Sequence, residues 1–403
     1  MKFMNIFKKA YCRVFQFGFR LAMPFLPYRI PEQMDGLDEI PALFKERGID
    51  SALLVIDANV RKLGLTRDFE NLLYAEGIKA SVYEQANPNP TIENVENARL
   101  VYIEGNAQAI VAIGGGSAMD CAKVCGARIA CPKKPVHKMK GVMKILKKTP
   151  LLIAVPTTAG TGSEVTLAAV ITDGETHHKY PINDFNLIPD IAVLDPKLTL
   201  GLPGNVTSTT GLDALTHAVE AYIGGSTTKF TREMSIEAVK LINENLETAV
   251  FNGSDVTARR KMLRAAYAAG ASFTRSYVGY VHGVAHSLGG KYGIAHGLAN
   301  AVILPVILRI YGKSCEIKLA DLAIKAEVVP KDTPKEEAAE KFIRRIEELN
   351  KKFDLPSGFP EIKEEDIPLM AMNADKESNP LYPVPMLMDA KELEKVYRLL
   401  IIK

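Results

Sequence analysis

The sequence predicts an α/β domain with a parallel sheet, followed by an all-helical domain. Three observations carry this prediction. The chain has 403 residues, which fits two domains better than one because a domain usually takes roughly 100–200 residues. Its apolar content of 47% with 24% charged residues is typical of a folded globular protein. Short apolar runs alternate with helical patterns before residue 200, whereas helical patterns follow one another after it.

The first 31 residues form a separate basic segment, with six Lys and Arg residues and no acidic residue. Two interpretations fit it: an amphipathic helix that packs on the domain or on a partner chain, which we favour, or a helix on a membrane surface. No apolar stretch reaches the roughly 20 residues of a transmembrane helix. The five cysteines are odd in number and lack CxxC spacing, so we expect reduced thiols and a cytoplasmic protein.

The predicted sheet domain covers residues 32–200. Strand-type runs are expected at SALLVID (51–57), AIVAIGGG (109–116), LLIAVPTT (151–158) and IAVLD (191–195). Helical patterns between them include NVENARLVYIEG (94–105) and SAMDCAKVCGARIA (117–130). Strands that alternate with helices predict a parallel sheet with both faces covered.

The predicted helical domain covers residues 201–403. It starts after DPKLTLGLPGN (195–205), where two prolines and two glycines interrupt the chain. Helical patterns follow at 210–223, 231–246, 256–273, 296–312 and 335–353, the last strongly amphipathic. The net charge of +3 is small, so nothing indicates a nucleic-acid partner.

Two loops at predicted strand ends are candidates for binding phosphate. In the first, the run Gly114–Gly116 ends a strand, and Ser117 is expected to cap the next helix. Bare amides at a helix N-terminus favour an anion such as a pyrophosphate, although glycines there are as often only a tight turn. In the second, VPTTAGTGSEVT (155–166), hydroxyls stand among glycines. Two such loops on one parallel sheet predict a Rossmann-like dinucleotide site.

Asp57 ends the strand SALLVID. A carboxylate there can accept hydrogen bonds from a ribose and would repel a 2′-phosphate, which favours NAD over NADP. An aspartate that starts a turn before the next helix is an equal alternative.

The helical half concentrates histidines around one acidic residue. Asp213 and His217 lie four residues apart, as do His282 and His286, and His296 follows. Residues at this spacing share one helical face. Imidazole and carboxylate without thiolate suit Fe(II) or Zn(II) at a site that is not a zinc finger. From spacing alone, the two pairs at four-residue spacing are the simplest ligand set.

Several motifs resemble the iron-containing, or group III, alcohol dehydrogenases. They are NPNPT (87–91), GGGSAMDCAK (114–123), PTTAGTGSEVT (156–166), TGLDALTHAVEAY (210–222), GYVHGVAHSLGG (279–290), HGLANAVILP (296–305) and KESNPLYPVP (376–385). Their order matches the family over roughly residues 30–385. The resemblance implies an N-terminal dinucleotide-binding domain, a C-terminal helical domain, and cofactor and metal in a cleft between them.

Carried over residue by residue, the resemblance implies a metal site formed by Asp213, His217, His282 and His296. It places His286 beside the metal, where it orients groups or relays protons. It implies cofactor contacts from Asp57, Asn89, Gly114, Gly115, Gly116, Ser117, Thr157, Thr158, Thr161 and Lys179. The family usually has proline where this chain has Ala295, and Ser287 and Lys291 depart from many members near the substrate.

The resemblance therefore implies an oxidoreductase that transfers a hydride between NAD(H) and a metal-bound primary alcohol or aldehyde. The metal is expected to be Fe(II), with Zn(II) possible, and the protein a homodimer or higher homo-oligomer. Two alternatives are an NAD- and metal-dependent lyase of the dehydroquinate synthase type and a non-catalytic metal-stabilised binding protein. The metal motifs contain little Lys or Arg for an anionic sugar acid, which argues against the lyase.

Overall fold

The computed structural model describes residues 4–86, 89–174 and 179–402. The chain divides into two compact units. The sheet unit comprises Pro27–Leu202 and Gly253–Gly270, and the helical unit comprises Met1–Leu26, Pro203–Asn252 and Ala271–Lys403. The domain limits expected from the sequence stay a prediction.

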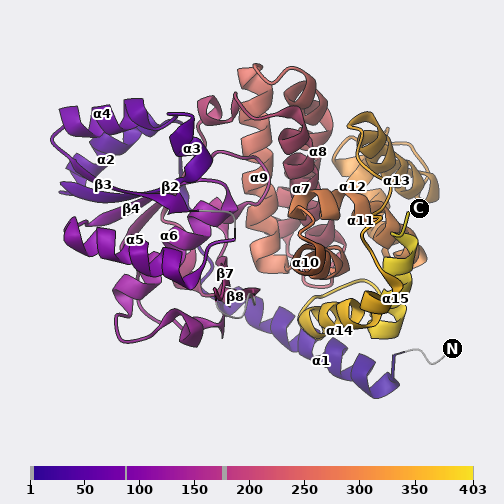
Figure 1. Ribbon diagram of the computed structural model, residues 1–403. Coiled ribbons are helices and arrows are strands. Elements are labelled where there is room, and N and C mark those ends of the chain that lie inside the picture. Colours follow the sequence, from indigo (N-terminus) through magenta and orange to yellow (C-terminus); the bar gives the residue numbers. More distant parts are fainter. Residues whose placement is uncertain (1–3, 87–88, 175–178, 403) are drawn as a thin grey trace. The chain divides into compact units, whose positions relative to one another are not determined.

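The sheet unit is built on a six-stranded sheet in which neighbouring strands are parallel (Figure 1). In spatial order the strands are β1 (Glu32–Met34), β9 (Ile191–Val193), β6 (Leu151–Pro156), β4 (Ala109–Gly114), β2 (Ser51–Asp57) and β3 (Lys79–Ala86). Ile56 lies opposite Ile113, and Gly114 lies opposite Pro156. The carboxyl ends of β2, β4 and β6 therefore meet at one edge.

Helices cover both faces of this sheet (Figure 1). They are α2 (Ile40–Glu46), α3 (Ala58–Lys62) and α4 (Arg67–Ala75) on one face, and α5 (Ile92–Glu104) and α6 (Gly116–Ala130) on the other. Side chains alternate along a strand, so Leu54 packs in the same core as Phe44, whereas Leu53 packs with Met119. Every residue from Ser51 to Ile56 is buried, which explains the apolar run.

A second, three-stranded sheet belongs to the same unit and was not predicted. Its order is β5 (Gly141–Val142), β8 (Lys179–Asn183) and β7 (Ala168–Thr172). The described 3-10 helices are η1 (Met23–Phe25), η2 (Leu37–Glu39), η3 (Val136–Met139), η4 (Ser163–Val165), η5 (Phe185–Leu187), η6 (Pro196–Thr199) and η7 (Glu364–Asp366).

The helical unit contains α1 (Ile6–Ala22), α7 (Gly204–Ile223), α8 (Lys229–Phe251), α10 (Tyr280–Tyr292), α11 (His296–Tyr311), α12 (Lys313–Lys325), α13 (Lys335–Lys352), α14 (Ile367–Ser378) and α15 (Ala390–Leu399). Helix α9 (Val256–Ser276) is shared, because its residues from Ala271 onward belong to this unit. Helix α7 is the centre, packed against α8, α11 and α12. A parallel sheet unit and a helical unit confirm the predicted fold class.

Helix α1 packs along one side against the C-terminal part of the helical unit. Gln16 Nε2 donates to Tyr382 O at 2.8 Å, and Arg13 donates to Val384 O at 2.8 Å. Cys12 is buried beside them, and all five cysteines are free thiols. Within the described residues, no helix has the length and apolarity needed to cross a membrane.

Candidate metal and nucleotide sites

Three helices bring the predicted metal ligands together. Asp213 and His217 stand one turn apart on α7, His282 lies on α10, and His296 is the first residue of α11. The chain turns between α10 and α11 at Gly293, whose φ of 70° is left-handed and is easily adopted only by glycine. This turn folds the start of α11 back toward the α10 histidines.

These four side chains can each present one ligand atom, and the atoms lie within 4.8 Å of one another. His282 Nε2 is 4.0 Å from Asp213 Oδ1, and His296 Nε2 is 3.6 Å from the same oxygen. Asp213, His217 and His282 are buried, whereas the His296 side chain is 40% exposed. The group of four side chains is therefore buried except on the side of His296, where it is accessible.

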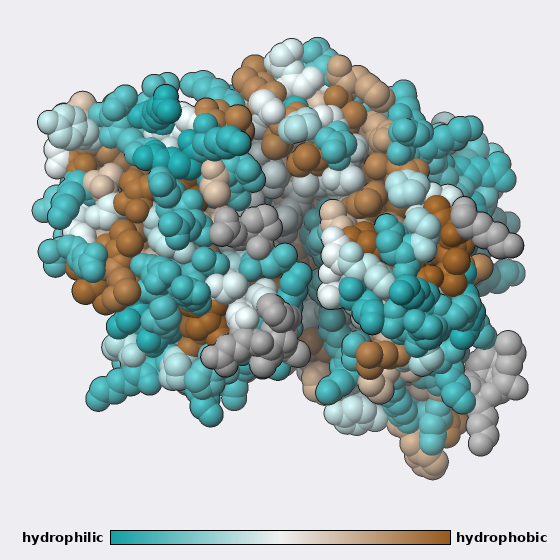
Figure 2. Space-filling model, in the orientation of Figure 1, coloured by the Kyte–Doolittle hydropathy of each residue, from teal (hydrophilic) through white to brown (hydrophobic). Residues whose placement is uncertain are grey.

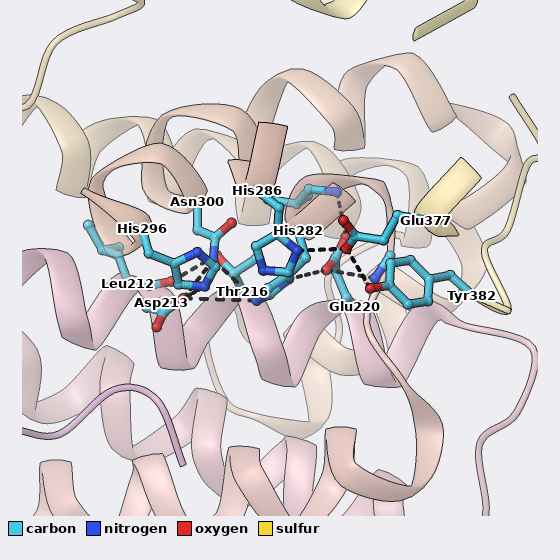
Figure 3. Close-up of polar contacts among 12 residues, drawn as sticks. Leu212, Asp213, Thr216, Glu220, His282, His286, His296, Asn300, Glu377 and Tyr382 are labelled. Atoms are coloured by element: carbon cyan, nitrogen blue, oxygen red, sulfur yellow. Dashed lines mark hydrogen bonds and ion pairs between the residues drawn. The ribbon is translucent and has the colours of Figure 1, made fainter. Parts of the chain in front are cut away.

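Asn300 lies among the ligand atoms, one turn after His296 (Figure 3). Its Nδ2 donates to Asp213 Oδ1 at 2.6 Å and lies 3.2 Å from His282 Nε2 and 3.1 Å from His296 Nε2. Three acceptor atoms thus converge on one point, while an amide has only two hydrogens to offer. Converging lone pairs from imidazole and carboxylate fit a divalent cation.

Glu220 binds His282 through Nδ1, the ring nitrogen that points away from Asp213. Its carboxylate accepts hydrogen bonds from His282 Nδ1 at 2.6 Å and from the backbone N–H groups of Gly279 and Val281, both at 2.8 Å. With Nδ1–H donated to Glu220, the Nε2 lone pair of His282 is directed toward Asp213 and Asn300. Such a carboxylate behind a ligand histidine fixes its tautomer and its orientation.

His286 is held separately from the four-residue group. Its Nδ1 lies 2.6 Å from Glu377 Oε1, which also accepts a hydrogen bond from the Tyr382 hydroxyl at 2.8 Å (Figure 3). Its ring stacks on His296 with centroids 5.2 Å apart, and its side chain is 41% exposed. His286 therefore stands at the accessible side of the group with its own carboxylate partner.

The surroundings favour different charge states for these histidines. Desolvation by the surrounding protein lowers the pKa of His296 to about 4 and that of His282 well below its usual value. Burial also acts to lower the pKa of His286, but the charge and hydrogen bond of Glu377 outweigh it, so that pKa is raised. Neutral His282 and His296 keep their lone pairs available.

In the sheet unit, the two predicted loops lie against each other at the carboxyl edge. A Cβ built on Gly116 would lie 3.1 Å from Thr161 Cγ2, and one on Gly115 would lie 3.6 Å from Thr158 Oγ1. Thr157 N donates to Gly114 O at 3.0 Å. The glycines thus leave a cradle of backbone and threonine hydroxyls at the N-terminus of α6, which fits a phosphate group.

Two expectations about this edge need correction or detail. Gly115, not Ser117, is the N-cap of α6; the Ser117 hydroxyl instead accepts a hydrogen bond from Asn89 N at 3.3 Å. Asp57 caps α3, with Oδ1 accepting from the amides of Asn59 and Val60. Asp57 therefore does start the turn into the next helix, and it uses one of its two carboxylate oxygens to do so.

Lys179 lies on β8 of the three-stranded sheet, whereas the glycine loop follows β4 of the six-stranded sheet. It pairs with Thr172 across β8 and β7, and Thr172 forms a bridge with Thr91, which follows Asn89 in the NPNPT motif. Burial lowers the pKa of the Lys179 amine. Residues 87–88 of NPNPT and 177–178 of HHKYP lie outside the described residues.

Four residues of the histidine site were missed by the sequence analysis: Glu220, Asn300, Glu377 and Tyr382. Helical spacing offered a signal for the first two, because Glu220 lies three residues after His217 and Asn300 four after His296. Glu377 is 91 residues from His286, so no local spacing connects them.

A helical unit that gathers imidazoles around a carboxylate, in one chain with a dinucleotide-type sheet unit, defines a metal- and nucleotide-dependent class of enzyme. Comparison with protein-family models agrees. Residues 27–196 match the model described as iron-containing alcohol dehydrogenase, and residues 207–401 match the C-terminal model of the Fe-containing alcohol dehydrogenase family.

Individual relatives agree with these matches. The NAD-dependent methanol dehydrogenase of Bacillus methanolicus is 37% identical over 338 residues, which cover 83% of this chain and 88% of the relative. The crystal structure of a 1,3-propanediol oxidoreductase has a TM-score of 0.87 and 34% identity, covering 92% of this chain and 98% of that one. A sulfoacetaldehyde reductase from Bifidobacterium kashiwanohense, in complex with NAD⁺, has a TM-score of 0.82 and 25% identity, covering 93% and 98%.

The chain belongs to the iron-containing alcohol dehydrogenase family. It is accordingly an oxidoreductase, and the family resemblance expected from the ordered motifs is confirmed.

Proposed function

We propose that this protein is an NAD-dependent alcohol dehydrogenase that interconverts a primary alcohol and its aldehyde with the help of a divalent metal, Fe(II). The observation that carries the proposal is the group of Asp213, His217, His282 and His296, whose ligand atoms lie within 4.8 Å of one another. When bound, the metal supplies a Lewis acid for the substrate oxygen, and NAD supplies the hydride acceptor.

The four residues of this group are the proposed metal ligands. Three imidazoles and one carboxylate provide nitrogen and oxygen donors, which suit Fe(II) and also Zn(II). Glu220 and Asn300 orient these ligands through His282 Nδ1 and Asp213 Oδ1. Because the group is open on the side of His296 and His286, a substrate can approach from there.

His286 is the proposed residue for handling the hydroxyl proton. It lies at the accessible side, its ring stacks on His296, and Glu377 can stabilise the imidazolium that forms when the proton arrives. The Tyr382 hydroxyl, which donates to the same Glu377 oxygen, holds that carboxylate in place.

The glycine and threonine loops are the proposed site of NAD. Amides at Gly114–Ser117 and hydroxyls of Thr157, Thr158 and Thr161 can receive the pyrophosphate at the N-terminus of α6. Asn89 and Lys179 are the other proposed contacts. Asp57 uses Oδ1 for its cap, so we assign its other oxygen to the ribose and expect NAD to be preferred over NADP.

The lyase alternative has little support. Lys291 is the basic residue nearest in sequence to the α10 histidines, and its ammonium group is already paired with Asp366 at 2.8 Å. The matched families are alcohol dehydrogenases, and the two structural neighbours named above are a 1,3-propanediol oxidoreductase and a sulfoacetaldehyde reductase.

The test is NADH oxidation with a panel of short aldehydes, after reconstitution with Fe(II) or with Zn(II) in the absence of oxygen. We expect turnover with at least one aldehyde and a marked preference for NADH over NADPH. No turnover with any aldehyde under either metal would refute the dehydrogenase proposal.

A pair of variants tests the assignment of the histidines. His296→Ala should lose metal because it removes a ligand, whereas His286→Ala should keep its metal and lose turnover. Metal content measured on both purified proteins after reconstitution decides the matter. Equal metal loss in both variants would place His286 among the ligands and contradict the assignment.

We also propose a cytoplasmic location and a homodimer or higher homo-oligomer. The five free thiols support a reducing compartment, and the oligomer follows from the family resemblance. Light scattering coupled to size-exclusion chromatography measures the mass directly, and a monomer would refute the second proposal.

A further inference from the structure

Helix α1 is fixed to the helical unit along one narrow side. Cys12 and Gln16 are its buried residues, and the C-cap residue Met23, seven residues after Gln16, is also buried. Gln16 and Arg13 donate to backbone carbonyls of residues 380–385, and Lys8 forms an ion pair with Asp375 at 2.7 Å. The helix is therefore held in a defined orientation, with a definite side turned away from the unit.

That opposite side is apolar. At 3.6 residues per turn, six large side chains fall on the half of the helix away from Cys12, and we call them the outer face of α1: Ile6, Phe7, Tyr11, Val14, Phe17 and Leu21. Their exposed fractions run from 59% for Tyr11 and Leu21 to 80% for Phe7. At the lower right of Figure 2, where Figure 1 draws both α1 and α14, brown and tan residues lie among hydrophilic ones. Exposed apolar patches of this kind mark sites of interaction.

Basic residues border the outer face. Lys9, Arg13 and Arg20 follow one another at four and seven residues, so they lie along one side of the outer face, next to Ile6. The Arg13 guanidinium donates to Val384 O and Pro385 O, so we assign the contacts with headgroups to Lys9 and Arg20. No acidic residue occurs in the first 31 residues. A second copy of α1 placed face to face would bring two such basic sides together without an opposite charge, which argues against self-association through this face.

We infer that the outer face of α1 binds the surface of an anionic phospholipid bilayer. An amphipathic helix lies in the plane of the interface, with apolar side chains about 5–10 Å into the acyl boundary and Lys and Arg at the headgroups. Basic residues near an anionic surface add electrostatic attraction to this binding. The 17 residues of α1 extend about 25 Å along the surface. This inference does not depend on the proposed reaction.

The experiment is flotation of the full-length, metal-reconstituted protein with vesicles of phosphatidylcholine alone or with 30% phosphatidylglycerol added. We expect at least tenfold stronger binding to the anionic vesicles, weakened by 0.5 M NaCl because salt screens surface charges. The triple variant Phe7→Ser, Val14→Ser, Phe17→Ser should lose binding. Thermal unfolding and dehydrogenase activity close to wild type will show that this variant is folded.

A matched control changes exposed apolar residues away from α1. The double variant Leu63→Ser, Tyr74→Ser alters side chains that are 67% and 87% exposed in the sheet unit, and it should bind vesicles like wild type. Failure of the wild type to bind anionic vesicles, or wild-type binding by the triple variant, would overturn the inference. A lower oligomeric mass of the triple variant without any vesicle binding would identify a second copy as the occupant instead.

Discussion

The carboxylate of Glu220 should matter for metal affinity although it lies outside the proposed ligand set. Its Oε2 accepts from His282 Nδ1 and Gly279 N, and its Oε1 accepts from Val281 N. In Glu220→Gln, one of these oxygens becomes an amide nitrogen that faces a donor. The glutamine is expected to turn its nitrogen toward Val281, because the opposite orientation would leave two donors without an acceptor.

Two effects follow from that substitution. One buried N–H loses its acceptor, which destabilises the fold by about 1–3 kcal/mol. The hydrogen bond that orients His282 also changes from a charge-assisted bond to a neutral one, which is roughly half as strong. Loss of such a partner typically weakens metal binding 10–100-fold, or about 1.4–2.7 kcal/mol. We therefore expect Glu220→Gln to bind Zn(II) 10–100-fold more weakly than wild type.

Glu377→Gln is the matched control, since it removes a carboxylate from His286, which is outside the proposed ligand set. Competition with a chromogenic chelator measures Zn(II) affinity for both variants, and near-ultraviolet circular dichroism shows whether each is folded. Glu377→Gln should keep wild-type affinity and lose turnover. Wild-type affinity in Glu220→Gln, or an equal loss in both variants, would refute the reasoning.

Two further predictions concern stability. Gly162 has φ 62°, and a Cβ on it would lie 2.7 Å from Gly270 Cα, so Gly162→Ala should lower the free energy of unfolding, measured by urea titration, by about 2–4 kcal/mol. The control Gly201→Ala, whose Cβ would meet no neighbour within 4 Å, should unfold at nearly the wild-type urea concentration. Equal unfolding midpoints for the two variants would contradict the close approach of Gly162 to Gly270. The hydrogen bond from Lys352 lowers the pKa of Glu247 below its ordinary 4.5, so the pair stabilises the fold above pH 4.5 and loses this contribution as pH falls through the folded pKa. Glu247→Gln should then destabilise by less than about 1 kcal/mol at pH 7, and a deficit that persists in acid would argue against the ion pair.

The parts of the fold that could be predicted are those with a strong local pattern. Strands β2 and β4 are buried on both faces and read as apolar runs. Strand β3 lies at the edge of the sheet, and most of its residues are half-buried or exposed. Its sequence therefore contains no apolar run from which a strand could be predicted. The small second sheet was missed because its strands are short and because β5 pairs with β8, from which β6 and β7 separate it along the chain.

For the histidine site, spacing located the region but could not choose the ligands. His286 and His296 both lie within reach of His282 along the chain, and only the family resemblance favoured His296. The structure adds physical reasons, since Glu377 engages His286 from α14 while the turn at Gly293 folds His296 toward Asp213. Both contacts depend on tertiary packing, which helical periodicity does not encode.

The reactivity of the buried Cys12 thiol can report whether α1 is attached to the helical unit. Cys12 is 1% exposed where α1 meets the helical unit, and Cys121 is 0% exposed within α6. Burial raises the pKa of both thiols, so neither reacts readily while its surroundings are intact. Release of α1 alone would expose Cys12 to an alkylating reagent and leave Cys121 protected. The chain thus carries two native thiols whose alkylation distinguishes detachment of one helix from opening of the sheet unit, without any engineered cysteine.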